Sequence, residues 1–144
     1  MTLEVKHLLT VAPVYLWIGF VCAISFMEAR LKFRAPGVTI PIGLGIGRLV
    51  FNRLNKVEWF FAITIIASLF VSKTTSFSFE NSTFFIPVIL LIAQTTWLLP
   101  ALDARAEILI KGQIPPPSNL HFYFAGIEVV KVISLFIFSI KQFN

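Results

Sequence analysis

Residues 8–27 read LLTVAPVYLWIGFVCAISFM, and this stretch decides the fold class. It offers about 20 mostly apolar positions, and a helix of that length rises about 30 Å, enough to cross the hydrocarbon core of a bilayer. The rest of the chain has the same character, since 57% of its 144 residues are hydrophobic, only 13% are charged, and the mean hydropathy is +0.86. A soluble domain carries about 25% charged residues, so a water-soluble fold is excluded.

Three further stretches are expected to cross the membrane, at residues 43–72, 84–102 and 120–141. The second of them includes polar turns, because the clean apolar run at 59–71 is too short to span alone. The chain is therefore predicted to be an all-α membrane protein. Residues 1–144 should form a single domain, a bundle of four transmembrane helices with both termini on the same side.

Prolines and glycines mark the connections and the close contacts between helices. The segment 28–41 combines three basic residues with turn-forming residues, so we expect a basic loop there and a second helix that begins only after Pro41. Pro100 lies deep in the third span and should kink it. Gly43 and Gly47 have the Gly-x-x-x-Gly spacing that permits close helix packing.

Positive charge is distributed unequally between the two ends of the predicted bundle. Eight Lys or Arg lie beside the first and third loops, against three on the other side. These eight residues are Arg30, Lys32, Arg34, Arg48, Arg53, Lys56, Arg105 and Lys111. The positive-inside rule makes that face cytoplasmic and places both termini outside, in a bacterial inner membrane. Attraction to anionic lipid headgroups accounts for the flanking charges, so the net charge of +5 does not indicate a nucleic-acid partner.

Charged and polar residues occur where a bilayer disfavours them, and every predicted helix contributes at least one carboxylate. The expected ligand-binding or functional polar cluster consists of Glu28, Lys32, Arg48, Asn52, Glu58, Asp103, Arg105, His121, Glu128 and Lys131. A charge at the bilayer centre costs about 2.5–3.5 kcal/mol, so Glu128 and Lys131, three residues apart, should face the interior and pair. Such a pair either locks the helix packing or lines a solvated cavity or ligand path; the remaining alternative is that Lys131 extends to an interface.

The polar residues of the second span recur at helical spacing and should form one stripe that faces the bundle. That stripe consists of Arg48, Asn52, Asn55 and Glu58. Leu49 and Leu54 are then expected to face lipid. The single cysteine, Cys22, excludes a disulfide within the chain and is expected to be a small buried apolar residue.

A metal site would draw on Glu28, Glu58, Asp103, His121 and Glu128, which offer carboxylate and imidazole ligands from all four helices. Carboxylate bundles that hold two metal ions use Glu-x-x-His motifs, and none occurs here. Basic residues also nearly match these acids in number, so no metal is assigned. No Ser, Cys or His triad can be assembled either, and catalytic residues, cofactors and the question of an enzymatic role stay open.

Four segments together resemble a group of small, uncharacterised bacterial four-helix membrane proteins. They are SFMEARLKFRAPGV at 25–38, GLGIGRLVFNRLNKVE at 43–58, LDARAEILIKG at 102–112 and HFYFAGIEVVK at 121–131. The likeness covers most of the chain. It implies the four-helix topology and draws attention to the same ten polar positions, but it implies no activity and no substrate.

Three function classes fit these observations. The first is a small protein that binds or transports a small ligand or ion through a polar cavity open to the cytoplasm. The second is a membrane-embedded metal- or cofactor-dependent enzyme or redox protein that uses the Glu, Asp and His residues. The third is an accessory subunit whose charges lock its fold. The lipid bilayer is the expected partner in all three, with a homo-oligomer or a larger membrane complex as the expected assembly.

Overall fold

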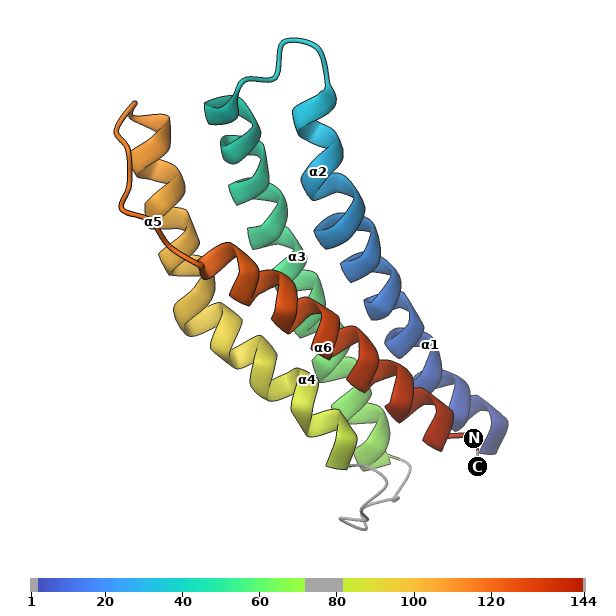
Figure 1. Ribbon diagram of the computed structural model, residues 1–144. Coiled ribbons are helices and arrows are strands. Elements are labelled where there is room, and N and C mark those ends of the chain that lie inside the picture. Colours follow the sequence, from blue (N-terminus) through green and yellow to red (C-terminus); the bar gives the residue numbers. More distant parts are fainter. Residues whose placement is uncertain (1–2, 72–81, 144) are drawn as a thin grey trace.

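The computed structural model describes residues 3–71 and 82–143, with side chains from residue 8 onward, and shows an all-helical chain without strands in these ranges (Figure 1). Within them, four helical stretches are long and apolar enough to cross a membrane. They are Leu8–Arg34, Ile40–Val71, Ser82–Ile110 and Leu120–Lys141. The predicted all-helical class with four apolar spans is confirmed.

The first span is one continuous helical stretch built from segments of different winding. It consists of α1 (Leu3–Val21), the π-helix η1 (Cys22–Glu28), the short α2 (Ala29–Leu31) and the 3₁₀ turn η2 (Lys32–Arg34). The predicted loop from residue 28 is therefore wrong over its first half. Residues 29–34 are mostly Ala, Arg, Leu and Lys, which favour helix, and the chain turns only at Gly37, whose φ is 79°.

The second span, α3 (Ile40–Val71), begins before Pro41 rather than after it. Proline is tolerated in the first turn of a helix because the amide it lacks would have no partner there. The predicted end of this span at residue 72 lies outside the described residues, as does most of the polar connection expected at 73–83. The expected orientation of Leu54 is wrong: its side chain is 2% exposed and packs inside the bundle, whereas Leu49 is 71% exposed.

The third span again changes its winding in the middle. It consists of α4 (Ser82–Ala93), the π-helix η3 (Gln94–Leu98) and α5 (Leu99–Ile110). Pro100 lies two residues after the end of the π-helix at Leu98, so the backbone widens where a proline removes a hydrogen-bond donor. The fourth span, α6 (Leu120–Lys141), begins and ends where the sequence predicts.

The four spans pack side by side, and the start of α1 and the end of α6 lie at the same end of the bundle (Figure 1). Helix α1 contacts α3 and α6, α4 contacts α6, and α3 contacts α5. The larger apolar core lies toward the chain ends and includes Trp17, Ile65, Leu91, Leu135 and Phe138. A smaller apolar cluster lies nearer the basic end, around Leu98, Leu99 and Phe124. Polar side chains occupy the level between these two clusters.

Candidate functional site

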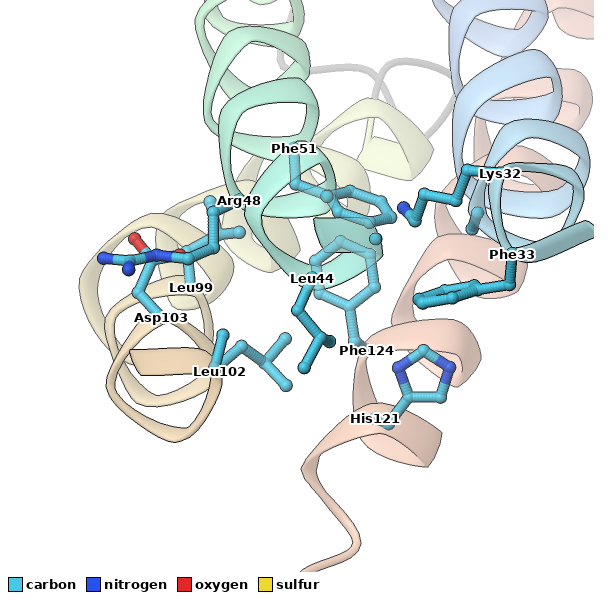
Figure 2. A pocket seen from close by; sticks show the side chains of 14 residues that line it. Lys32, Phe33, Leu44, Arg48, Phe51, Leu99, Leu102, Asp103, His121 and Phe124 are labelled. Atoms are coloured by element: carbon cyan, nitrogen blue, oxygen red, sulfur yellow. The ribbon is translucent and has the colours of Figure 1, made fainter. Parts of the chain in front are cut away.

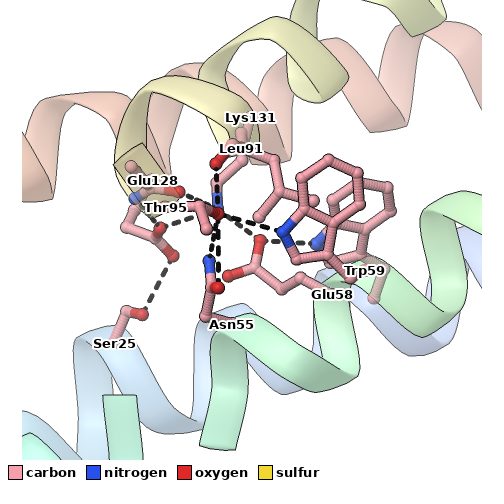
Figure 3. Close-up of polar contacts among 10 residues, drawn as sticks. Ser25, Asn55, Glu58, Trp59, Leu91, Thr95, Glu128 and Lys131 are labelled. Carbon is pink, nitrogen blue, oxygen red and sulfur yellow. Dashed lines mark hydrogen bonds and ion pairs between the residues drawn. The ribbon is translucent and has the colours of Figure 1, made fainter. Parts of the chain in front are cut away.

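An ammonium group lies in the interior of the bundle, on Lys131 of α6, whose side chain is 0% exposed. Its Nζ donates to Glu58 Oε2 of α3 and to Gln94 Oε1 of η3, the latter at 2.5 Å, and lies 2.8 Å from Glu128 Oε1 one turn earlier (Figure 3). An ammonium has three N–H donors, and these three oxygens offer a partner to each. The charge of Lys131 is thereby compensated without water.

Glu128 is enclosed as completely as Lys131, with a side chain that is 0% exposed. Gln94 Nε2 donates to Glu128 Oε1 at 2.5 Å, and Ser25 Oγ of η1 donates to Glu128 Oε2 at 2.9 Å. Both ends of the Gln94 amide are thus used, one toward the carboxylate and the other toward the ammonium. Burying a charge is tolerated only where its lone pairs are satisfied in this way.

Glu58 completes a set of three ionisable residues, Glu58, Glu128 and Lys131, called the buried triad below. The Glu58 side chain is nearly inaccessible, and Trp17 Nε1 of α1 donates to its Oε2 at 2.8 Å, the same oxygen that Lys131 reaches. With both carboxyl groups ionised, two negative charges face one positive charge, and the triad carries a net charge of −1. All four spans therefore contribute a polar side chain to one compact site that contains two carboxyl groups and one ammonium group.

Both π-helical segments contribute a side chain to this site. Ser25 lies within η1 and Gln94 within η3, and these two residues hold Glu128. The next residue of η3, Thr95, donates to the Leu91 carbonyl at 2.7 Å and accepts from Trp59 Nε1 at 2.9 Å (Figure 3). Single turns of π-helix are rare and occur mostly at functional sites. Here two π-helical segments lie at the level of one buried charge cluster.

A pocket of about 120 Å³ lies at the basic end of the bundle (Figure 2). It has room for several water molecules, since one water requires about 10–15 Å³ measured in this way. Its lining residues come from all four spans and combine apolar side chains with a few charged ones. The main polar and aromatic ones are Lys32, Phe33, Arg48, Phe51, Asp103, His121 and Phe124. Because His121 is exposed and Arg48 and Asp103 are half-buried, the pocket reaches the surface.

The cations of the pocket are held in place by acids and aromatic rings. Lys32 Nζ lies 3.3 Å from Glu28 Oε2 and 5.3 Å from the centre of the Phe51 ring. Arg48 Nε lies 3.5 Å from Asp103 Oδ1 across the gap between α3 and α5. Partly exposed ion pairs contribute about 1 kcal/mol or less to stability, so the main effect of these pairs is to set the charge of the pocket.

The pocket and the buried triad are stacked in register along the helix axes. On η1 and α2, Ala29 lines the pocket and Ser25 lies one turn deeper; on α6 the corresponding residues are Phe124 and Glu128. One helical turn is about 5.4 Å, so a layer of side chains about one turn deep lies between the pocket and Glu128, whereas Glu58 lies seven residues beyond Phe51, about two turns deep. Phe51 packs in that layer against Phe124, with ring centres 5.0 Å apart (Figure 2).

The ten polar residues expected to form one cluster divide between these two levels. Three of them, Glu58, Glu128 and Lys131, form the buried triad. Six lie in or beside the pocket: Glu28, Lys32, Arg48, Asn52, Asp103 and His121. Arg105 lies apart, since its guanidinium donates to the Pro116 carbonyl in the connection to α6.

Sequence patterns did not single out Gln94, Trp17 or the aromatic pair Phe51 and Phe124. Gln94 had a usable signal, because an amide in the middle of an otherwise apolar span is costly unless it is hydrogen-bonded. Phe51 and Phe124 carried no comparable signal in the sequence, since the chain is rich in Phe throughout. Cys22, expected to be buried, is exposed on the outer face of η1.

The candidate metal ligands are not gathered into a metal site. Among the residues that the structure describes, no group of three or more His, Cys, Asp or Glu side chains lies close enough together to hold a metal ion. Glu58 and Glu128 converge, but the ammonium of Lys131 lies between them. Glu28, Asp103 and His121 belong to the pocket level instead.

Comparisons with known protein families, with curated proteins and with solved structures yield no match to this chain. Inference about its function therefore rests on the geometry of the pocket and the buried triad.

Proposed function

We propose that the four helices cross a bilayer and that the protein binds or transports a small ligand or ion, which enters through the pocket at the basic, cytoplasmic end. The observation that carries this proposal is the stacking of an accessible pocket directly over a buried triad of unequal charge. Ionisable residues inside a membrane bundle are costly and commonly mark ligand or ion pathways. Here Glu128 lies about one helical turn beneath a cavity that reaches the surface, and Glu58 and Lys131 lie about two turns beneath it.

The charge of the triad argues against a role in helix packing alone. A structural lock needs one acid for each base, as in the pairs formed by Arg48 and Asp103 or by Lys111 and Glu107. The triad has two acids for one base, and replacing even a balanced buried ion pair by apolar residues is often neutral or stabilising. Burial of a second carboxyl group costs free energy, and helix packing does not require that group.

Ligand-dependent stabilisation of the purified protein tests this proposal. The protein in lipid nanodiscs would be heated with each member of a panel of small carboxylates, small amines and alkali-metal salts. A ligand that binds only the folded state raises the unfolding temperature. We expect at least one class to do so, and we expect Leu44→Trp, which fills the pocket, to abolish the shift.

Leu49→Trp is the matched control, because Leu49 lies on the same helix but faces outward. This variant should keep the full ligand-induced shift. Two results would overturn the proposal: no panel member stabilises the wild-type protein, or Leu44→Trp responds as the wild type does. Compounds that stabilise would then be tested for flux in proteoliposomes, which separates transport from binding.

A further inference from the structure

We propose that the buried triad is a proton-binding site, in which Glu58 takes up one exchangeable proton from the pocket side. This proposal rests on the proposed function because the pocket is taken as the route of the proton. It extends that function by naming the ion that is bound. The step is Glu58–COO⁻ + H⁺ → Glu58–COOH, in which no electron is transferred and no other bond breaks.

The carboxyl groups in the interior of the bundle outnumber the ammonium group. With both carboxyl groups ionised, Glu58, Glu128 and Lys131 leave one negative charge uncompensated in a region where their side chains are almost completely buried. An unpaired buried charge is strongly disfavoured, and a buried carboxyl group commonly neutralises by taking up a proton. One proton brings the triad to net zero.

The other elements packed around Glu58 bring no further charged group to the triad in the described part of the chain. The groups that face the triad from α1 and η1 are the indole N–H of Trp17 and the hydroxyl of Ser25, and from η3 the amide of Gln94. None of these titrates in the ordinary pH range. In the described part of the chain, Glu128 and Lys131 are therefore the charged partners of Glu58, and the balance of charge depends on these three residues.

The two carboxyl groups of the triad differ in how their oxygens are hydrogen-bonded. Both oxygens of Glu128 already accept hydrogen bonds, from Gln94 and Ser25, and its Oε1 also faces Lys131. Glu58 is different, because Trp17 and Lys131 both donate to its Oε2. Among the described residues, no hydrogen bond reaches Glu58 Oε1. That oxygen is the available position for a proton.

The same count argues against a metal cation as the exchanged ion. Metal cations such as Ca²⁺ and Mg²⁺ are held by six or more oxygen ligands, including waters. The ammonium of Lys131 already occupies the position between the two carboxylates and the Gln94 oxygen. The one oxygen without a hydrogen bond, Glu58 Oε1, is enough to bind a proton. It is too few ligands to coordinate a metal cation.

The two sides of the triad differ in what separates it from the surface. Toward the pocket, Phe51 and Phe124 pack against each other in an aromatic layer, and the buried Leu54 lies between Phe51 and Glu58 on α3. Toward the chain ends, the bundle continues into the larger apolar core, and in the described residues no further buried titratable group follows the triad in that direction. Proton exchange is therefore one-sided in this conformation and requires displacement of the aromatic layer.

Infrared spectroscopy of the reconstituted protein tests the proton site without any ligand. A protonated carboxyl group gives a C=O stretching band that is separate from the amide bands. We expect such a band at pH values above those at which exposed carboxyl groups protonate, about pH 4, and we expect it to grow as pH falls in the wild type and in the control Glu107→Gln, whose carboxyl group is exposed. The band should be absent in Glu58→Gln.

If Glu58→Gln fails to fold, Trp17→Phe provides a second test of the same band. This change removes the indole N–H that donates to Glu58 and should shift the frequency of the band. An unshifted band in that variant, a band that persists in folded Glu58→Gln, or the absence of a band at every pH at which the protein stays folded would each overturn the proposal. Loss of the band on addition of Na⁺ at constant pH would also overturn it, by showing a metal-cation site.

The rate of deuterium exchange at the same band tests the route. Phe124→Ala should accelerate exchange severalfold after transfer to D₂O, because it opens the layer beneath the pocket. Phe138→Ala opens the apolar core on the opposite side and should leave the rate unchanged. Equal acceleration in both variants would overturn one-sided access. If the band is assigned to Glu58 but no panel compound stabilises the protein, the proton site is supported and the proposed ligand pocket is contradicted. If a panel compound stabilises the protein but no band is assigned to Glu58, the ligand pocket is supported and the proton site is contradicted.

Discussion

Lys131 Nζ lies 2.8 Å from Glu128 Oε1 on the preceding turn of α6, and neither side chain is accessible from outside the bundle. A pair three residues apart on one helix is a local contact, which the sequence alone suggests. The structure extends it across the bundle, because Glu58 of α3 and Gln94 of η3 reach the same ammonium. This arrangement and the pocket above it lead to four predictions.

Lys131→Met should destabilise the protein by about 3–5 kcal/mol, because removal of one partner strands a buried charge. The double variant Glu128→Gln with Lys131→Met should recover most of that loss, since Glu58 then remains as a single carboxyl group that can take up a proton. Ligand-induced stabilisation should not return. Reversible unfolding in mixed micelles measures the stability, and Lys111→Met, at an exposed ion pair, is the control that should leave it unchanged. A double variant with a full ligand response would show that the pair only locks the fold.

Trp17→Phe should cost about 1.5–3 kcal/mol, the usual loss for a hydrogen bond to a charged group. Trp17 is buried, and its indole N–H donates to Glu58 Oε2. Trp97→Phe serves as the matched control, because Trp97 is 56% exposed and its loss should change stability little. Equal losses in both variants, measured by the same unfolding assay, would contradict a specific role for the Trp17 contact.

Gly43→Ala should weaken ligand-induced stabilisation, because the added Cβ would lie 2.2 Å from the Phe33 ring and must displace that wall of the pocket. Gly45→Ala is the control, since nothing lies within 4 Å of its added Cβ. Replacing a helix glycine by alanine favours helix by about 1 kcal/mol, so the control should be slightly more stable than the wild type. The measurement is the shift in unfolding temperature that the same panel of compounds produces in each variant. A Gly43→Ala variant with unchanged ligand response would show that Phe33 moves without affecting the pocket.

Cysteine labelling from one side of the membrane tests the orientation. In a Cys22→Ser background, Arg34→Cys and Gln113→Cys should react only from the cytoplasmic side, because these positions flank the basic end. Ser76→Cys and Asn144→Cys should react only from the outside. Labelling of Arg34→Cys and Ser76→Cys from the same side would contradict the four-span topology.

Much of the fold follows from the sequence because apolar length is a local property. A run of about 20 apolar residues needs no tertiary information to be recognised as a span, and α6 therefore begins and ends where predicted. Helix ends were less predictable. Pro41 was expected to precede α3, but it lies inside the first turn, where the penalty for a missing amide is small.

The partners of the buried charges were decided only by the tertiary structure. The sequence by itself determined that Glu128 and Lys131 lie on adjacent turns of an apolar helix and must find compensation, because an isolated buried charge is too costly. It could not determine that Glu58, 73 residues before Lys131, shares the same ammonium, since that contact depends on how α3 and α6 are packed. Nor could it separate the buried triad from the pocket at the basic end. The periodicity of one helix shows which residues share a face, whereas the level at which faces of different helices meet is set by packing of the whole bundle.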